Sequence, residues 1–497
     1  MADPANAKLE SEKRSLEQAQ HVLRDVFGHE SFRPSQSAVI EHVLAGQHAM
    51  VIMPTGRGKS MCFQIPALLG SDNDLTLVLS PLIALMQDQV DGLIAKGVDA
   101  TFINSSLDRM ERERRQEKLR QNRYRLLYVT PERFRKPEFL AAISGRNIQL
   151  LAIDEAHCVS QWGHDFRPDY SRVADIRQQL GSPTTIALTA TATAECRADI
   201  VDQIGLKEGD MRLFHEGIDR PNLRIDVESV MGDDEKLEMI LEALTTPPFQ
   251  TTKAQAGGGA ILYFSLIKTL SRFSDLLLAR SIDHVCYHGD QSRKDRRRIQ
   301  NEFMSGERDL VLATPAFGMG VDKEDIRLVV HVETPGSMES YYQEIGRAGR
   351  DDLPSRCLWL YDQDDLMTQM QFIEWANPDA DFYDRLMFSL ENHADRCMAY
   401  GLDWLRGELQ RVSPHDHRVD TALAMLDRHG VVAGPREPDC FQVIGSLPEE
   451  FRDNQWLSGK RQRDQKRLYA MVQFAAAASE ERQTFLNRYF LDDAPMQ

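Results

Sequence analysis

Short runs of Val, Ile and Leu alternate with longer segments of helical spacing in the first half of the chain. The apolar runs lie at 48–52, 76–80, 125–130, 150–154 and 185–190. Continuous apolar runs of this kind, separated by helices, are typical of strands that are buried on both faces of a parallel sheet. The pattern therefore predicts an α/β domain with a doubly wound parallel sheet.

A second series of apolar runs repeats this layout further along the chain. Its members lie at 260–264, 284–287, 309–313, 326–332 and 356–361. A turn-rich segment at 205–222 separates the two series, and a Pro- and Gly-containing segment at 245–260 is expected to form a surface loop. We therefore expect two tandem domains of the same class.

The strand pattern fades after residue 365, and the remaining sequence has helical spacing. Residues 419–432, followed by 440–445, predict a helix, a turn and a short hairpin, as in a winged helix; a plain helical bundle explains the region equally well. We expect a mainly helical C-terminal region behind two sheet domains. The predicted parts are an N-terminal extension (1–21), a first domain (22–207), a second domain (208–365) and the helical region (366–497).

Length and composition agree with a globular protein of about three domains. Of 497 residues, 42% are hydrophobic and 27% are charged, which excludes a disordered chain. The 59 Lys and Arg against 76 Asp and Glu give a formal net charge of −17, which excludes a basic protein that coats nucleic acid. No apolar segment reaches the roughly 18 residues of a membrane span, and the polar N-terminus has no signal-peptide pattern. We expect a cytoplasmic protein, associated with the nucleoid if it is bacterial.

The strongest local motif is a glycine-rich loop at 53–60, MPTGRGKS, which follows an apolar run and precedes a helical segment. A phosphate-binding loop needs glycines so that backbone N–H groups can face the phosphates, a Lys that reaches the β and γ phosphates, and a hydroxyl that holds Mg²⁺. Gly56, Gly58, Lys59 and Ser60 supply these groups, although Met53 stands where the strict pattern has Gly. By itself the loop is also compatible with an ordinary Gly-rich turn.

An acidic pair, Asp154 and Glu155, follows the buried strand at 150–153. An Asp at the carboxyl end of such a strand can hold Mg²⁺, and the neighbouring Glu can orient or deprotonate a water molecule. An isolated acidic pair is often only a surface turn. Its position downstream of a phosphate-binding loop in the same α/β domain favours a nucleoside triphosphate site.

Two arginines, Arg347 and Arg350, lie three residues apart in the segment 341–351, YYQEIGRAGRD. On a helix this spacing directs both side chains to the same side, and guanidinium groups suit the dispersed charge of a phosphoryl-transfer transition state. If the two sheet domains face each other, these arginines can reach a nucleotide held by the first domain. The alternative is an arginine pair on a solvated surface helix.

These motifs, together with several others in the same order, resemble the RecQ family of superfamily 2 DNA helicases over residues 22–361. The further matching segments are LRDVFGHESFRPSQ at 23–36, SPLIALMQDQV at 80–90, YVTPER at 128–133, CVSQWGHDFRPDY at 158–170, ALTATAT at 187–193 and ATPAFGMGVDKEDIRLVVH at 313–331. The resemblance implies two RecA-like domains and an ATP-dependent DNA helicase that uses ATP and Mg²⁺.

The resemblance also implies roles for individual residues. Adenine contacts are implied for Arg33 and Gln36, and contacts to the rest of the nucleotide for Thr55, Gly56, Arg57, Gly58, Lys59 and Ser60. The implied Mg²⁺ ligands are Ser60 and Asp154. The implied catalytic residues are Lys59, Asp154, Glu155, Gln343, Arg347 and Arg350, and the implied coupling residues are His157 and Asp322. Contacts to DNA are implied for Ser80, Thr130, His288 and Thr314.

The segment 158–170 resembles the aromatic-rich loop by which this family couples DNA binding to hydrolysis. Trp162 and Phe166 offer flat faces on which bases can stack, Arg167 offers a cation, and Gln161 is a further candidate DNA contact. The alternative is that both aromatic side chains belong to a core. Their setting among Gly, His, Asp and Pro, rather than in a periodic element, disfavours that alternative.

Two departures from the family pattern change what the resemblance implies. Arg57 stands where the family commonly has Gly, and its side chain either touches phosphate or projects outward. Residues 466–490 resemble the helical hairpin of the family's zinc module, yet four alanines at 475–478 occupy the region of its first cysteine. The seven cysteines of the chain are scattered and form no CxxC pair, so we expect reduced thiols and no zinc.

The resulting hypothesis is a monomeric 3′–5′ helicase that moves along single-stranded DNA and unwinds tailed or branched duplexes in repair or recombination. A DNA-stimulated translocase without strand separation, a nucleotide-binding scaffold and an RNA helicase are alternatives. The complete catalytic set disfavours the scaffold, and the aromatic loop disfavours the RNA helicase.

Basic runs at 109–125, 293–298 and 460–467 are candidate DNA contacts, although solvated helix faces have the same pattern. The sequence indicates neither a membrane nor a particular protein partner.

Overall fold

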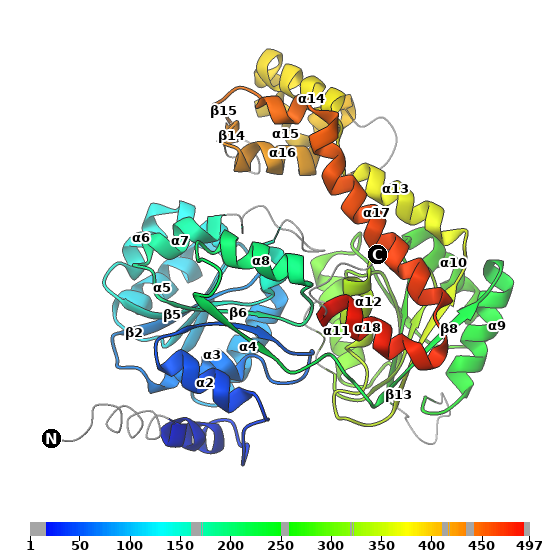
Figure 1. Ribbon diagram of the computed structural model, residues 1–497, viewed down its shortest axis with the longest axis horizontal. Helices are drawn as coiled ribbons and strands as arrows, with labels where there is room; N and C mark the ends of the chain where they lie inside the picture. Colours follow the sequence, from blue (N-terminus) through cyan, green and yellow to red (C-terminus); the bar gives the residue numbers. More distant parts are fainter. Residues whose placement is uncertain are drawn as a thin grey trace.

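The computed structural model describes residues 16–160, 170, 172–249, 258–318, 321, 323–409, 416, 418–433 and 442–491. Two parallel-sheet domains lie side by side, and a helical region follows them in the chain (Figure 1). The predicted fold class is confirmed. Along these described ranges, none of the helices has both the length and the apolar character of a membrane span.

The first domain contains a seven-stranded parallel sheet in the order β3-β4-β2-β5-β6-β1-β7. Its strands are β1 (His48–Ile52), β2 (Asp74–Leu79), β3 (Ala100–Ile103), β4 (Leu126–Val129), β5 (Asn147–Ile153), β6 (Thr184–Thr189) and β7 (Met211–His215). The helices are α2 (Gln36–Leu44), α3 (Met61–Leu69), α4 (Ile83–Ala95), α5 (Arg109–Arg120), α6 (Pro137–Ile143), α7 (Val173–Gln179) and α8 (Ala194–Gln203). Apolar side chains are buried in one core on each face of the sheet, as continuous apolar runs predict.

The second domain contains a six-stranded parallel sheet in the order β10-β11-β9-β12-β13-β8. Its strands are β8 (Leu223–Ser229), β9 (Gly259–Tyr263), β10 (Val285–Tyr287), β11 (Leu310–Ala313), β12 (Ile326–His331) and β13 (Ser355–Tyr361). The helices are α9 (Gly232–Thr245), α10 (Ile267–Leu278), α11 (Arg293–Met304) and α12 (Met338–Ile345). This sheet also has a core on each face.

Three strands, β3, β7 and β8, are missing from the predicted series, and all three lie at sheet edges. β7 and β8 mix buried with exposed positions, because an edge strand has only one paired neighbour and is less fully covered. The predicted boundary at 207/208 would separate β7 from the sheet that it completes. The chain changes sheets between His215 and Leu223, inside the predicted turn-rich segment.

The C-terminal region begins with α13 (Asp365–Trp375), which leads away from the second domain (Figure 1). A small module with its own apolar core follows. It consists of α14 (Ala380–Asn392), α15 (Ala394–Leu409), α16 (Arg418–Arg428) and the antiparallel strands β14 (Val432–Ala433) and β15 (Gln442–Val443). The predicted helix, turn and hairpin are therefore present, and they lie within a group of helices.

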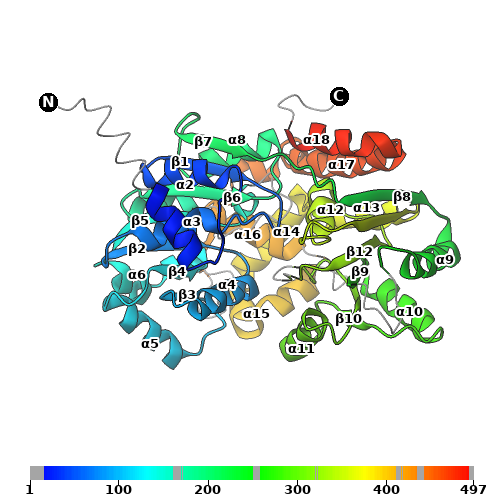
Figure 2. The same cartoon turned by 90° about the horizontal axis from the view of Figure 1, so that it is seen from below.

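The chain returns to the second domain through α17 (Asn454–Ala476), which forms a helical hairpin with α18 (Arg482–Leu491) (Figure 2). Phe474 of α17 is fully buried and stacks on Trp359 of β13, with the ring centroids 6.4 Å apart and the rings 12° from parallel. Phe490 of α18 packs against Tyr342 of α12. The hairpin that resembles a zinc module is thus attached to the sheet domain by apolar packing.

The described cysteines are all free thiols, as expected. In the part of the chain that the structure describes, no three or more His, Cys, Asp and Glu side chains come together in a way that could hold a metal ion. The expectation that the protein has no zinc remains a prediction.

Candidate active site

The glycine-rich loop connects β1 to α3 at the carboxyl edge of the first sheet. Gly56 and Gly58 have φ angles of 78° and 77°, a left-handed conformation that glycine adopts without strain. A side chain at Gly58 would lie 2.6 Å from Nε2 of Gln36. The loop therefore needs its glycines both for its backbone conformation and for the close approach of Gln36.

Lys59 folds back over this loop. Its Nζ donates hydrogen bonds to the carbonyl oxygens of Met53 at 2.9 Å and Pro54 at 3.4 Å. Burial lowers the pKa of Lys59, while the carboxylates of Glu155 and Asp154 act in the opposite direction. The ammonium group thus interacts electrostatically with both predicted acidic residues, which follow a different strand.

The acidic pair lies at the carboxyl end of β5, next to the loop. Asp154 is only 6% exposed, and burial, followed by the charge of Glu155, raises the pKa of its carboxyl to about 7. The backbone N–H of Glu155 donates to Oδ1 of Asp154 at 3.0 Å. Carboxylate and hydroxyl oxygens are the ligands that Mg²⁺ prefers, so Asp154 and Ser60 each carry a donor atom of the kind that fits this ion.

His157 connects the acidic pair to the segment at 187–193. Its Nδ1 lies 3.4 Å from Oε2 of Glu155 and 3.0 Å from Oγ1 of Thr189. Thr189 in turn accepts a hydrogen bond from the N–H of Thr191. The predicted coupling residue therefore bridges two of the matched motifs.

Arg33 and Gln36 form hydrogen bonds to the backbone of the glycine-rich loop. Nε2 of Gln36 donates to the carbonyl oxygens of Arg57 at 3.2 Å and Gly58 at 3.1 Å. Nη1 of Arg33 donates to the carbonyl oxygen of Gly56 at 2.9 Å, and its backbone N–H donates to Oε1 of Gln36. These two residues are therefore linked directly to the loop that would carry the phosphates.

The two arginines do not lie on a helix, and this part of the expectation is wrong. Helix α12 ends at Ile345, and residues 346–352 form turns that end in a bend; we call this segment the arginine loop, and in it Gly349 has a φ angle of 55°. The two arginine side chains have different contacts. Arg347 is buried in its own domain and donates a hydrogen bond to the carbonyl oxygen of Gly318.

Arg350 is the arginine that reaches the first domain. A methyl group at Gly56 would lie 3.2 Å from Cγ of Arg350, so the aliphatic part of this side chain lies directly over the glycine. The charge of Arg350 also contributes to the lowered pKa of Lys59. Gln343, on α12, is half-buried.

Two further contacts join the glycine-rich loop to the arginine loop. The hydroxyl of Thr55 donates to the carbonyl oxygen of Gly346 at 2.9 Å. Nη2 of Arg57 lies 3.4 Å from Oδ1 of Asp352. The side chain of Arg57 is thus directed toward the second domain, and Asp352 is a partner that the sequence does not indicate.

Arg220, in the connection between the two sheets, is a second residue that the sequence reading missed. Its side chain is 5% exposed, and Nη2 donates to the carbonyl oxygens of Ala348 and Gly349, at 2.8 Å each. Nη1 donates to the carbonyl oxygen of Gly346 at 3.4 Å. In the sequence, Arg220 is marked only as a cation within a turn-rich segment. Such a position by itself indicates a surface turn.

The predicted DNA contacts that the structure describes lie at strand ends. Ser80 and Thr130 follow the paired strands β2 and β4, and His288 and Thr314 follow the paired strands β10 and β11. Each sheet therefore places two of these residues side by side at its carboxyl edge. Gln161, Trp162, Phe166, Arg167 and Asp322 lie outside the described residues.

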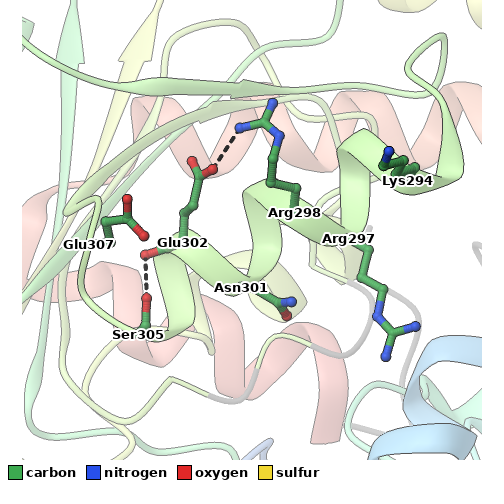
Figure 3. A pocket seen from close by; sticks show the side chains of 7 residues that line it. All are labelled: Lys294, Arg297, Arg298, Asn301, Glu302, Ser305 and Glu307. Atoms are coloured by element: carbon green, nitrogen blue, oxygen red, sulfur yellow. Dashed lines mark hydrogen bonds and ion pairs between the residues drawn. The ribbon is translucent and has the colours of Figure 1, made fainter.

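The three basic runs differ in how far their charges are paired. In α5, Arg109, Arg114, Arg115 and Arg120 form ion pairs with glutamates of the same helix. In α17, Lys460 bonds to the end of α13, and Arg467 lies 3.6 Å from Glu339. In α11, Arg298 pairs with Glu302 at 2.6 Å, whereas Lys294 and Arg297 extend from the helix at the rim of a pocket (Figure 3).

Comparisons with known proteins agree with this arrangement. The protein-family model for DEAD/DEAH box helicases matches residues 33–199, and the family model for the helicase conserved C-terminal domain matches residues 235–352. The ATP-dependent DNA helicase RecQ of Haemophilus influenzae is 41% identical over 344 residues, which are 69% of this chain and 53% of that protein. RecQ of Bacillus subtilis is 42% identical over 361 residues, with coverages of 72% and 58%. The chain thus spans little more than half the length of these curated relatives.

A shorter relative is covered more fully. The Probable ATP-dependent DNA helicase RecS of Bacillus subtilis is 36% identical over 379 residues, which are 76% of this chain and 73% of that protein.

Two solved structures support the fold. The helicase MrfA bound to DNA and AMPPNP has a TM-score of 0.57 at 19% identity, covering 71% of this chain and 52% of that one. S. cerevisiae Dbp5 bound to RNA and ADP BeF3 has a TM-score of 0.56 at 14% identity, covering 84% and 98%.

Proposed function

Because this chain belongs to the RecQ family of ATP-dependent DNA helicases, we propose that it couples ATP hydrolysis to movement along single-stranded DNA and to strand separation. The observation that carries the proposal is the position of the Arg350 side chain, which comes from the second domain and lies directly over Gly56 of the first. A nucleotide bound there touches both domains. Binding and release of ATP therefore change how tightly the domains are held together, which is the motion a translocating motor needs.

We assign the chemistry to residues around the glycine-rich loop. Lys59 would exchange its carbonyl partners for the β and γ phosphates. Ser60 and Asp154 would hold Mg²⁺, which neutralises phosphate charge when bound. Glu155 would orient and deprotonate the attacking water, and Arg350 would stabilise the charge that develops on the transferred phosphoryl group.

Arg347 and Gln343 take supporting roles in this proposal. The hydrogen bond from Arg347 to Gly318 holds the segment that follows Thr314, and Thr314 is a proposed DNA contact. Gln343 lies one helical turn before the arginine loop. Movement of that loop during the ATP cycle would therefore reach the DNA track of the second domain.

The DNA track in this proposal runs along the carboxyl edges of both sheets. Ser80 and Thr130 supply the contacts of the first domain, and His288 and Thr314 those of the second. The aromatic loop at 158–170 would stack on bases. We further propose 3′–5′ polarity, tailed or branched duplex substrates, a role in DNA repair or recombination, and action as a cytoplasmic or nucleoid-associated monomer.

One set of assays tests this function. ATP turnover of the full chain is measured with and without single-stranded DNA, and unwinding is measured on duplexes with a 3′ or a 5′ tail. We expect DNA to stimulate turnover and only the 3′-tailed duplex to unwind. ATP turnover that does not respond to single-stranded DNA would refute the proposal that the chain is a DNA-dependent motor.

A second candidate is a translocase that does not separate strands. The observation that favours it is the α17–α18 hairpin, which is attached by apolar packing and has alanines where the related zinc module has its first cysteine. DNA-stimulated turnover with no unwinding of either duplex would support this candidate over the helicase.

A further inference from the structure

The connection between the two sheets contains two neighbouring residues whose side chains bind different parts of the protein. Arg220 bonds to the carbonyl oxygens of the arginine loop, as described above. Asp219 bonds to the C-terminal hairpin: its Oδ1 accepts hydrogen bonds from Nε2 of Gln483 at 2.7 Å and from Nδ2 of Asn487 at 2.9 Å. One peptide unit thus links α18 to the loop that carries Arg350.

The contact of Arg220 leaves little freedom to the arginine loop. The buried guanidinium bonds to three of its carbonyl groups, and Nδ2 of Asn222 donates to Gly349 at 2.8 Å and to Leu353 at 3.1 Å. Hydroxyl Oη of Tyr342, at the end of α12, donates to the carbonyl oxygen of Ile218 at 2.6 Å. The connection and the arginine loop are therefore tied together by several hydrogen bonds.

Helix α18 is itself held by both domains (Figure 2). Phe490 packs on Tyr342 of the second domain with the ring centroids 5.3 Å apart. From the first domain, Nη1 of Arg197 donates to the carbonyl oxygen of Phe490 at 3.2 Å. Arg482 donates to the carbonyl oxygens of Ile225 and Val227 on the edge strand β8.

We infer that α18 is a positioning element of the ATP site, acting through Asp219 and Arg220 on the arginine loop. The inference rests on the proposed function, because it concerns hydrolysis at that site. Phosphoryl transfer depends on the placement of the stabilising cation, and small displacements of such a group slow the reaction strongly. Gln483, Asn487 and Asp219 are positioning residues in this scheme, since none of them touches the glycine-rich loop.

The test compares variants of the full chain in steady-state ATP hydrolysis. Asp219→Ala and the double variant Gln483→Ala/Asn487→Ala should lower kcat about threefold to tenfold, because Arg350 loses its alignment. KM for ATP should change less than about twofold, since the contacts of the glycine-rich loop remain. Asp219→Asn keeps the accepting oxygen and should retain near-normal turnover. Thr484→Ala, an exposed change on the same helix, is the matched control.

A double-mutant cycle separates positioning from general stability. In an Arg350→Ala background, Asp219→Ala should cause no further loss of kcat, because the group that it positions is already absent. A full additional loss would overturn the inference, as would a normal kcat in both hairpin variants. If the parent chain itself hydrolyses no ATP, the proposed function fails. If the parent is active and the hairpin variants have the same kcat as the parent, only the role of α18 is refuted.

Discussion

Arg57 of the glycine-rich loop faces Asp352 of the arginine loop, with Nη2 3.4 Å from Oδ1. The pair joins the two domains through the glycine-rich loop, which also makes the contact between Thr55 and Gly346. The large cation that replaces the family's common Gly thus has a protein partner. The contact with Asp352 favours a role of Arg57 in holding the domains together over a role in phosphate binding.

This pair predicts a charge-exchange effect. The side chain of Asp352 is 59% exposed, and exposed ion pairs contribute about 0.2 to 1 kcal/mol, so Arg57→Asp should raise KM for ATP only a few-fold. The exchange variant Arg57→Asp/Asp352→Arg should recover most of that loss. In about 0.5 M salt, the difference in KM for ATP between the parent and Arg57→Asp should shrink, because salt screens the pair. If Asp352→Ala has no effect while Arg57→Ala abolishes ATP binding, Arg57 binds phosphate instead.

The acidic pair predicts a separation of binding from chemistry. Glu155→Gln should lower kcat by about 100-fold or more, because the proposed general base is lost, while ATP binding is retained. Lys59→Ala should weaken binding as well as turnover, because in the proposed mechanism Lys59 reaches the phosphates. Binding is measured by equilibrium titration with a fluorescent ATP analogue, and Glu138→Gln, an exposed change on α6, is the control. Full turnover in Glu155→Gln would exclude this residue as the base.

Helix α11 predicts a local electrostatic contribution to DNA binding. Lys294→Ala/Arg297→Ala should weaken binding of single-stranded DNA and reduce the salt slope by about 1.4, since each phosphate contact contributes roughly 0.7. Arg298→Ala is the matched control, because Arg298 is paired with Glu302. Affinities are measured by fluorescence anisotropy at several salt concentrations. Equal slopes in the double variant and the parent would mean that this face of α11 is only solvated.

The packing of the hairpin predicts stability without metal. Phe474→Ala should cost about 3 to 5 kcal/mol in urea unfolding, because a fully buried ring is removed from the core that contains Trp359. Tyr469→Ala, on the same helix but 61% exposed, should have little effect. Treatment with a chelator should leave Tm unchanged. A lower Tm after chelation would reveal a structural metal site in the chain.

The aromatic loop predicts a loss of coupling without a loss of basal hydrolysis. Trp162→Ala should raise the DNA concentration needed for half-maximal stimulation about tenfold, because base stacking contributes about 1 to 3 kcal/mol. Turnover without DNA should stay the same, since the phosphate contacts are unchanged. ATP turnover is followed across a titration with single-stranded DNA. Unaltered stimulation would show that Trp162 does not contact bases.

The sequence by itself determined the sheet domains and the chemistry of the individual motifs. Central strands must be apolar on both faces, so their runs are readable from neighbouring residues, whereas the edge strands β7 and β8 mix buried with exposed positions and escape this reading. The glycine-rich loop is equally local, because its left-handed glycines, its Lys and its hydroxyl lie within eight residues. Local patterns of this kind follow from backbone geometry and burial, which nearby residues already specify.

Only the tertiary structure decided which residues meet across the domains. The spacing of Arg347 and Arg350 predicts side chains that point together, but α12 ends before them, and only Arg350 lies over Gly56. The partners of Arg57 and Arg220 lie far from them in the chain and show no local pattern. Such contacts depend on how two packed domains and the hairpin α17–α18 come together, and that arrangement is a property of the whole fold.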